Sequence, residues 1–120
     1  VAVDDVSGMV YVADRGNHRI RAVRAYLGNA SGTVSNFVYT LAGSDQGYSD
    51  GIGTLAKFNA PVGLAVDGYT RLLFVSDRDN MVIRKIELDT ARVTTLAGSP
   101  GVPGFANGRG QAAAFQLPTG

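Results

Sequence analysis

The 120-residue sequence contains no cysteine and no tryptophan, and its only histidine is His18. Without cysteine the chain has no disulfide framework and no thiol chemistry, although this absence does not fix its compartment, because many secreted proteins also lack disulfides. No apolar run approaches the roughly 20 residues that a helix needs to cross a bilayer, so no membrane span is predicted. The net charge is only +1, so no strong field attracts nucleic acid or anionic lipid.

What the sequence does have is the composition of an ordered domain. Hydrophobic residues make up 45% and charged residues 18% of the chain, which is typical of a globular protein and not of a disordered one. The length suits one small domain. The sequence begins at Val1 with neither a methionine nor a signal-peptide pattern, so we expect a processed or excised part of a longer protein.

The strongest feature of the sequence is an internal repeat. Residues 1–24 and 64–87 align without a gap and are identical at nine of 24 positions. The linkers repeat as well, because Gly51-x-Gly53, Ala56-x-Phe58 and Pro61-x-Gly63 return 57 residues later. Fixed-period similarity of this kind indicates a repeat architecture, here with units at residues 1–63 and 64–120.

Each unit is expected to contain four short strands. In the first unit, runs of β-branched and apolar residues between turn residues predict strands at 1–4, 9–13, 19–24 and 37–41. The second unit repeats them at 64–67, 72–76, 82–88 and 93–96. The connection at 25–36 is rich in Gly, Ser and Asn and is expected to be a loop. The linker at 42–63 has room for one helical turn at 54–58 before Pro61.

This plan predicts an all-β fold of two four-stranded antiparallel β-propeller blades. Four strands joined by hairpins and followed by a long link to the next unit are typical of one blade. The strands are nearly continuous apolar runs because a blade buries both of its faces against neighbours. Two blades cannot bury all of these faces, so the predicted partners are further blades from the same chain or from other copies.

The repeated residues resemble NHL repeats. The first unit has VAVD…VYVADRGNHRI, the second has GLAVD…LFVSDRDNMVI, and both continue as V-x-T-L-A-G-S…G-x-G-x-x-A-x-F-x-x-P-x-G. The resemblance covers essentially the whole chain and implies a propeller of six blades, of which this chain would form about a third. It also implies a binding or scaffolding surface more often than an active site. Val82 departs from the pattern, because the family usually has an arginine there, as at Arg19.

The turn after the second strand carries the same two polar residues in both units, namely Asp14 with Asn17 and Asp77 with Asn80. Paired acids can serve metal binding or catalysis, but Asp and Asn also satisfy backbone N–H groups in turns, where Gly or Asn suits a positive φ. We interpret all four as structural turn residues. The same interpretation applies to Asp4 and Asp67.

Arginines cluster in the first unit at positions 15, 19, 21 and 24. One interpretation is a face for an anionic partner such as RNA, which some NHL propellers bind, although no aromatic residue lies among these arginines to stack bases. The other interpretation is packing between blades, because Arg21 recurs as Arg84 and a long basic side chain can bury its apolar stem. We favour packing and keep an RNA-binding propeller as the alternative function.

No catalytic residue, metal ligand or cofactor is predicted. An enzyme related to NHL propellers binds zinc through several histidines, whereas His18 stands alone and is replaced by Met81 in the second unit. We therefore interpret His18 as an exposed turn residue. Asp45 and Asp50 lack the alternating oxygen spacing of a calcium loop. The expected function is non-enzymatic, and a fragment of a propeller enzyme is the less favoured alternative.

The connection at 25–36 is eight residues longer than its counterpart in the second unit and contains Asn29-Ala30-Ser31, an acceptor pattern for N-glycosylation. A loop tip rich in Gly and Ser would hold a glycan clear of the fold. Asn29 is therefore the glycosylation candidate, and an extracellular or cell-surface location is the matching expectation.

Blade geometry also predicts which loops lie together. In an antiparallel meander the second connection and the link to the next blade share one edge, so the turns at 14–17 and 77–80 lie with both linkers on one face, called here the linker face. Loops on a rigid scaffold often carry recognition. The candidate binding side chains on this face are Arg15, Arg78, Tyr48 and Phe105.

Tyr48 and Phe105 occupy matched positions and have an alternative role as plugs between neighbouring blades. We expect a structural or protein-interaction module that acts as a building block of a larger assembly. Blade-to-blade contacts that do not close into a ring would propagate into a filament.

Overall fold

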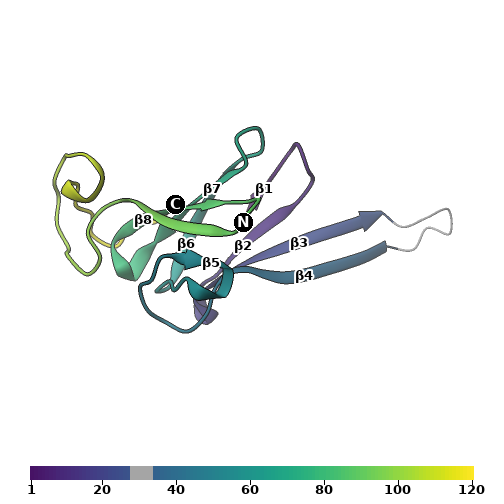
Figure 1. Ribbon diagram of the computed structural model, residues 1–120, viewed down its shortest axis with the longest axis horizontal. Coiled ribbons are helices and arrows are strands. Elements are labelled where there is room, and N and C mark those ends of the chain that lie inside the picture. Colours follow the sequence, from purple (N-terminus) through teal and green to yellow (C-terminus); the bar gives the residue numbers. More distant parts are fainter. Residues whose placement is uncertain (28–33) are drawn as a thin grey trace.

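The computed structural model describes residues 1–27 and 34–120, which form two antiparallel sheets (Figure 1). The first sheet has the strand order β1-β2-β3-β4 and contains β1 Ala2–Val3, β2 Val10–Asp14, β3 Arg19–Leu27 and β4 Val34–Gly43. The second has the order β5-β9-β8-β7-β6 and contains β5 Gly51–Ile52, β6 Pro61–Asp67, β7 Leu72–Asp77, β8 Val82–Glu87 and β9 Arg92–Ala97.

The helical elements of the described residues are 3-10 turns, namely η1 Arg15–Asn17, η2 Gly53–Leu55, η3 Arg78–Asn80 and η4 Gly110–Ala112. η1 and η3 connect the second and third strands of each repeat, while η2 and η4 lie in the two linkers. None of these short turns is long and apolar enough to cross a membrane, and the rest of the described chain contains no helix that is.

The prediction of two four-stranded antiparallel meanders is confirmed. The loop expected at 25–36 is wrong over much of its length, because β3 continues to Leu27 and pairs there with Val34 of β4. The Gly, Ser and Asn content hid this continuation, in which Tyr26 and Val34 are residue types that favour strands and the hairpin backbone pairs its own N–H and C=O groups. The hairpin projects away from the second sheet and extends a molecule that measures 55 × 28 × 22 Å (Figure 1).

A second difference from the predicted plan is β5, which lies in the linker of the first repeat. Gly51 pairs with Val93 and Ile52 pairs with Arg92, so this linker adds a fifth strand to the outer edge of the second sheet. The helical turn expected at 54–58 is the shorter η2, directly after β5. In space, the linker of the first repeat therefore packs on the second.

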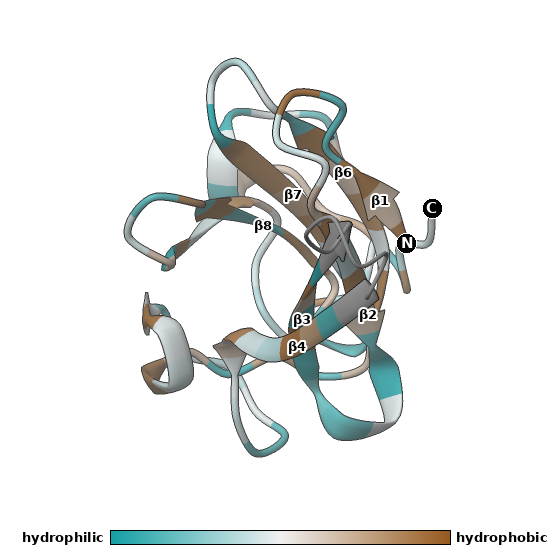
Figure 2. Ribbon diagram, turned by 90° about the vertical axis from the view of Figure 1, so that its right-hand side faces the viewer, coloured by the Kyte–Doolittle hydropathy of each residue, from teal (hydrophilic) through white to brown (hydrophobic). Residues whose placement is uncertain are grey.

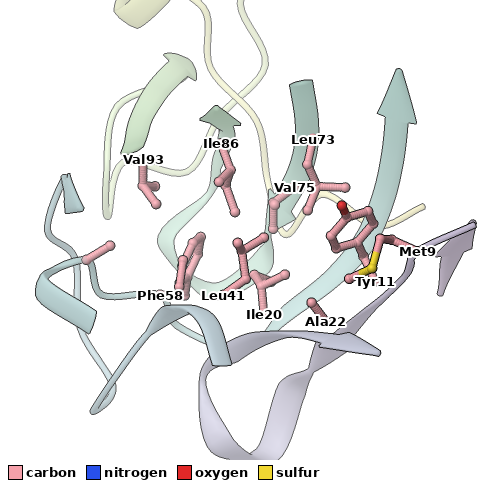
Figure 3. Packing of buried hydrophobic residues seen from close by; sticks show 12 residues of the cluster. Met9, Tyr11, Ile20, Ala22, Leu41, Phe58, Leu73, Val75, Ile86 and Val93 are labelled. Atoms are coloured by element: carbon pink, nitrogen blue, oxygen red, sulfur yellow. The ribbon is translucent and has the colours of Figure 1, made fainter. Parts of the chain in front are cut away.

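The hydrophobic core lies between the two sheets (Figure 3). Hydrophobic residues follow the strands, and hydrophilic residues gather in many of the turns (Figure 2). Phe58 of the linker is fully buried in the core, and burying a phenyl side chain stabilises the fold by about 1.5–3 kcal/mol. The first sheet contributes Tyr11, Ile20, Ala22, Leu41 and Ala42, the turn before β2 Met9, the second sheet Leu73, Val75, Ile86 and Val93, and the linker Ala56 and Phe58.

The left-handed residue in each turn after the second strand is not of the type expected. The sequence favours Gly or Asn for a positive φ, but His18 with φ 55° and Met81 with φ 60° adopt it. These residues follow η1 and η3, and each donates its backbone N–H back to the first residue of that turn. The expected residue type is wrong because the turn closes one residue later than its Gly and Asn positions suggested.

Gly43 and Gly98 close the outer strand of each repeat in a conformation that other residues avoid. Their φ angles are 103° and 92°. A Cβ on Gly43 would lie 2.7 Å from the carbonyl oxygen of His18, and a Cβ on Gly98 would lie 2.8 Å from that of Met81. The close approach of two backbones at these points requires glycine.

We expect Gly43→Ala to lower the free energy of unfolding by about 1–3 kcal/mol, because the new methyl group combines a left-handed φ with a backbone clash. Gly16→Ala is the matched control, since no atom lies within 4 Å of its Cβ position, and its effect should stay within about 0.5 kcal/mol. Urea denaturation at one protein concentration measures both variants. Equal losses at the two positions would contradict the prediction.

Candidate functional site

The guanidinium of Arg84 is the centre of the polar structure between the two repeats. Arg84 lies in β8 and is 0% exposed. Its Nη1 donates to Asp77 Oδ2 and to the carbonyl oxygen of Lys57, both at 2.9 Å. Its Nη2 donates to the carbonyl oxygen of Ser49 and to Asp50 Oδ1, also at 2.9 Å. Three of these four acceptors belong to the linker, so Arg84 ties the linker to the second sheet.

Two aromatic rings of the linker also contact this guanidinium. Its carbon lies 4.7 Å from the ring centroid of Tyr48 and 5.0 Å from that of Phe58. A cation over an aromatic face gains about 0.5–2 kcal/mol, with the larger values where water is excluded. The Tyr48 hydroxyl is further hydrogen-bonded to Thr95 of β9. Tyr48 thus packs in the way that a plug between repeats would.

Asp77 and Asn80 hold the same linker from the other side. Asp77 is 0% exposed and accepts hydrogen bonds from the backbone N–H of Asn59 and from Asn80 Nδ2, both at 2.8 Å. Burial raises the pKa of Asp77, while the hydrogen bonds from Asn80, Asn59 and Arg84 act in the opposite direction. Asn80 Nδ2 also donates to the carbonyl oxygen of Gly47 at 2.8 Å.

This geometry corrects the mechanism inferred for the turn residues. Asp77 and Asn80 lie at the predicted turn, but neither caps its backbone, and Asp14 gives η1 no side-chain cap either. In the second repeat, the spacing D-x-x-N-x-x-x-R instead binds the linker that arrives from the first repeat. The prediction that Arg84 is a buried packing residue is confirmed.

The first repeat carries the same three residue types at Asp14, Asn17 and Arg21, but among the described residues no linker lies against them. Asn17 Nδ2 donates to Asp14 Oδ2 at 3.0 Å, and Arg21 Nη1 lies 3.5 Å from the same oxygen. The side chains of Arg21 and Asp14 are 32% and 28% exposed, whereas those of Arg84 and Asp77 are fully buried. In the part of the chain that the structure describes, the bonds from Arg84 to a linker have no counterpart at Arg21.

A second clamp joins the sheets at the opposite ends of the strands. Asp4 is 1% exposed and accepts hydrogen bonds from the Val6 backbone N–H and the Ser7 hydroxyl, so its predicted role in the turn is confirmed. Arg71 of the second repeat donates to Asp4 Oδ2 at 3.3 Å and to Asp89 at 3.2 Å. Chiefly the Ser7 hydroxyl, with Arg71 contributing, holds the pKa of Asp4 below its usual value.

The four candidate binding side chains are not bonded to one another among the described residues. Arg15 is exposed in η1, and Arg78 in η3 bonds to Asp79 at 2.7 Å. Phe105 is 95% exposed, whereas Tyr48, its counterpart in the first linker, is 36% exposed beside Arg84. The glycosylation candidate Asn29 lies outside the residues that the structure describes.

His18 is a residue whose role the sequence did not reveal. It was expected to be exposed, but it is half-buried, and its Nδ1 accepts a hydrogen bond from the backbone N–H of Ala60 at 3.0 Å. The expectation was drawn from Met81 at the matching position of the second repeat. It is wrong because methionine has no imidazole nitrogen to accept such a bond, so the comparison could not reveal it. Within the described residues, no group of three or more His, Cys, Asp or Glu side chains is arranged to hold a metal ion.

A hollow with a volume of about 470 Å³ lies where β5 meets β9. Its charged side chains are Asp50 and Arg92, and Asp50 is already bonded to Arg84. The lining contains no nucleophile paired with a base, which is the arrangement that covalent catalysis needs.

We expect Arg84→Ala to lower the free energy of unfolding by about 3–5 kcal/mol, because Asp77 would remain buried without its countercharge. Arg92→Ala removes an exposed cation from the neighbouring strand and should change stability by less than about 0.5 kcal/mol. Urea denaturation of both variants, with hydrogen exchange at the amides of residues 47–59, measures the effect. Unchanged protection of the linker in Arg84→Ala would contradict the assigned role.

Acid should weaken the clamp at Asp4. Because the pKa of Asp4 is lower in the folded than in the unfolded state, its carboxylate stabilises the fold above the unfolded value of about 3.9 and loses this contribution as the pH falls through the folded value. Asp4→Asn should therefore flatten the fall in free energy of unfolding below about pH 4, as followed by urea denaturation. Asp5→Asn, at the exposed neighbour, is the control and should keep the wild-type profile.

Comparison with known sequences places these residues in a family. The model for the NHL repeat matches residues 1–22. NHL repeat-containing protein 2 of Homo sapiens is 36% identical over 98 residues, which cover 82% of this chain and 12% of the relative. Protein SUPPRESSOR OF QUENCHING 1, chloroplastic, of Arabidopsis thaliana is 30% identical over 99 residues, which cover 82% of this chain and 9% of that relative. The chain thus spans a small part of these relatives.

Solved structures show the same fold at lower identity. A structural genomics protein of unknown function from Bacteroides thetaiotaomicron matches with a TM-score of 0.75 over 98% of this chain and 28% of its own, at 22% identity. An auxiliary nutrient binding protein from the same organism matches with a TM-score of 0.71 over 92% of this chain and 28% of its own, also at 22% identity. The structural matches show that the two sheets are β-propeller blades, and the sequence matches, with the repeated D-x-x-N-x-x-x-R and linker motifs, show that the chain belongs to the NHL-repeat family.

Proposed function

We propose that this chain is a non-enzymatic interaction module, a propeller section whose two open sheet faces bind further blades. The observation that carries the proposal is that residues buried at the contact between the two sheets have exposed counterparts on the outward faces. Each outward face therefore matches a face that is buried in the contact between the two sheets, and could form the same kind of contact with another blade.

The outward face of the first sheet corresponds to the buried face of the second. Val38 of β4 is 49% exposed, whereas Val93, at the same position of the repeat, is 0% exposed. Val3 of β1 is 54% exposed, whereas its counterpart Val66 packs against the core. The side chain of Arg21 is likewise 32% exposed, whereas that of Arg84 is 0% exposed.

The outward face of the second sheet corresponds to the buried face of the first. Leu96 of β9 is 46% exposed, whereas Leu41 in β4 is 8% exposed. Phe115 of the second linker is partly exposed, whereas Phe58 of the first is fully buried. Apolar surface that is buried on association stabilises a complex by about 25 cal/mol per Å² before the entropy cost of binding.

The same ion pairs favour a scaffold over the RNA-binding alternative. Arg84 and Arg78 direct their charges at carboxylates within the chain, and Arg21 lies beside Asp14. The Asn29-Ala30-Ser31 triplet of the sequence supports an extracellular setting for the module. The bonds of Arg84 to the linker give the linker face a fixed shape, on which a protein partner would find exposed loops.

The 120-residue chain is expected to self-associate, because association covers its open apolar faces. Sedimentation velocity over a range of protein concentrations should show species heavier than the 12.5 kDa monomer. A chain that stays monomeric at every concentration and unfolds cooperatively would overturn the proposal. Addition of single-stranded RNA in a parallel run should leave the distribution unchanged, and a shift with RNA would favour the alternative function.

Val38→Lys places a charge on the open face of the first sheet and should weaken this association. Tyr69→Lys is the matched control, because Tyr69 is also an exposed apolar residue, at 89%, but lies in the turn after β6. Equal sedimentation of the two variants would show that the sheet face takes no part in association.

A further inference from the structure

We propose that the outer part of the β3–β4 hairpin is a dimerisation arm. In this proposal residues 24–27 of β3, called here the arm edge, pair antiparallel with the arm edge of a second copy of this chain. The contact is made by main-chain groups of one hairpin, and it is separate from the open sheet faces of the proposed function.

The arm is the part of the hairpin that extends past β2. Its two strands pair from Arg24 with Phe37 to Leu27 with Val34. The pairing of β2 with β3 ends at Val23, so among the described residues the arm edge has no second neighbouring strand. The arm projects from the body of a molecule whose longest dimension is 55 Å (Figure 1). A partner strand can therefore reach the arm edge without meeting the rest of the fold.

The two edges of the arm differ in what can cover them. The edge of β4 corresponds to the edge of β9, which the linker strand β5 covers in the second sheet. The arm edge corresponds to no linker position, because β8 pairs with β7 along its whole length, from Val82 to Glu87. A strand that joins the arm edge thus competes with no linker.

The arm lacks the features that usually keep an open strand edge from pairing. Such edges are very short, or they carry charged side chains or proline. Residues 25–37 contain no charged residue and no proline. The equivalent hairpin of the second repeat is short and charged, because it turns between Glu87 and Arg92 through Asp89, and the Ala91 N–H closes the turn on the Glu87 carbonyl oxygen at 2.8 Å. Of the two repeats, the first therefore presents the edge that can accept a strand.

A further strand would also stabilise the arm itself. A ribbon of two strands is marginally stable in water, and each of its edges leaves main-chain N–H and C=O groups without a partner in the sheet. Pairing of two arm edges produces a four-stranded sheet, with β3 of each copy in the middle. The main-chain groups of both arm edges are then paired.

The same edge of a second copy is a suitable partner strand. Antiparallel pairing about a two-fold axis brings one surface against itself, so each copy offers the groups that the other needs. Like charges that face each other across a sheet oppose pairing, and residues 25–37 contain none. Such a contact closes on itself and ends at a dimer.

Charge variants of the arm edge test the contact. The double variant Ala25→Lys, Tyr26→Lys and the double variant Ala25→Glu, Tyr26→Glu should each weaken dimerisation about tenfold, because like charges meet across the two-fold axis. An equimolar mixture of the two should restore dimerisation, since opposite charges then meet. This restoration separates a lost contact from a lost fold. Tyr69→Lys and Tyr69→Glu, in the turn after β6, are the matched controls and should have no effect, singly or mixed.

All of these chains carry Val38→Lys, which weakens association through the open sheet face, and sedimentation equilibrium gives their dimerisation constants. If the Val38→Lys chain is monomeric at every concentration, or if the charge variants dimerise as their parent does, the arm contact is overturned and the proposed function stands. If Val38→Lys leaves the association of the wild-type chain unchanged while the arm charges abolish it, the proposed function fails and the arm contact stands.

A single thiol tests the two-fold symmetry. The sequence has no cysteine, so Tyr26→Cys introduces the only thiol. A two-fold axis at the arm edge brings the two copies of residue 26 close together, and mild oxidation should link them into a dimer in much higher yield than with Tyr69→Cys. Equal yields at the two positions would contradict the two-fold arrangement.

Discussion

The structure depends on one buried cation. Removing the Arg84 guanidinium from water is tolerated because its two outer nitrogens donate to two carboxylates and two carbonyl oxygens and two aromatic rings lie near its carbon, although its Nε has no hydrogen-bond partner. Three of these hydrogen-bond acceptors come from the linker, which therefore has to cross to the second sheet and lie against it. The position of β5 and the burial of Phe58 follow from the same crossing.

Because of this dependence, the repeat that is read from the sequence differs from the unit that packs together in space. The first linker continues the first repeat in sequence, but its bonds go to the D-x-x-N-x-x-x-R of the second. A blade of this kind is complete only when its neighbour's linker arrives, since an arginine without it stays partly exposed, as Arg21 does. Full burial of this arginine thus depends on a linker from the preceding repeat, as the contacts of Arg84 show.

Several elements could be predicted because their signal is local. The runs of Val, Ile and Leu gave strands close to the observed bounds, and the recurrence of Arg21 as Arg84 marked a packing residue. Other elements had no local signal. A two-residue strand such as β5 has no periodicity and forms only where β9 presents an edge, and the hairpin beyond Arg24 is sustained by its own backbone pairing. The bond from Ala60 to His18 joins residues 42 positions apart.

The sequence by itself determined the number of repeats, their strands, and the polar residues that each repeat keeps. Only the tertiary structure decided what those residues bind. The carbonyl oxygens that accept hydrogen bonds from Arg84 lie 27 and 35 positions before it. Every residue has a main-chain carbonyl, so the sequence does not show which ones will serve as acceptors. Their role arises when the chain crosses between sheets and the desolvated guanidinium takes the acceptors within its reach.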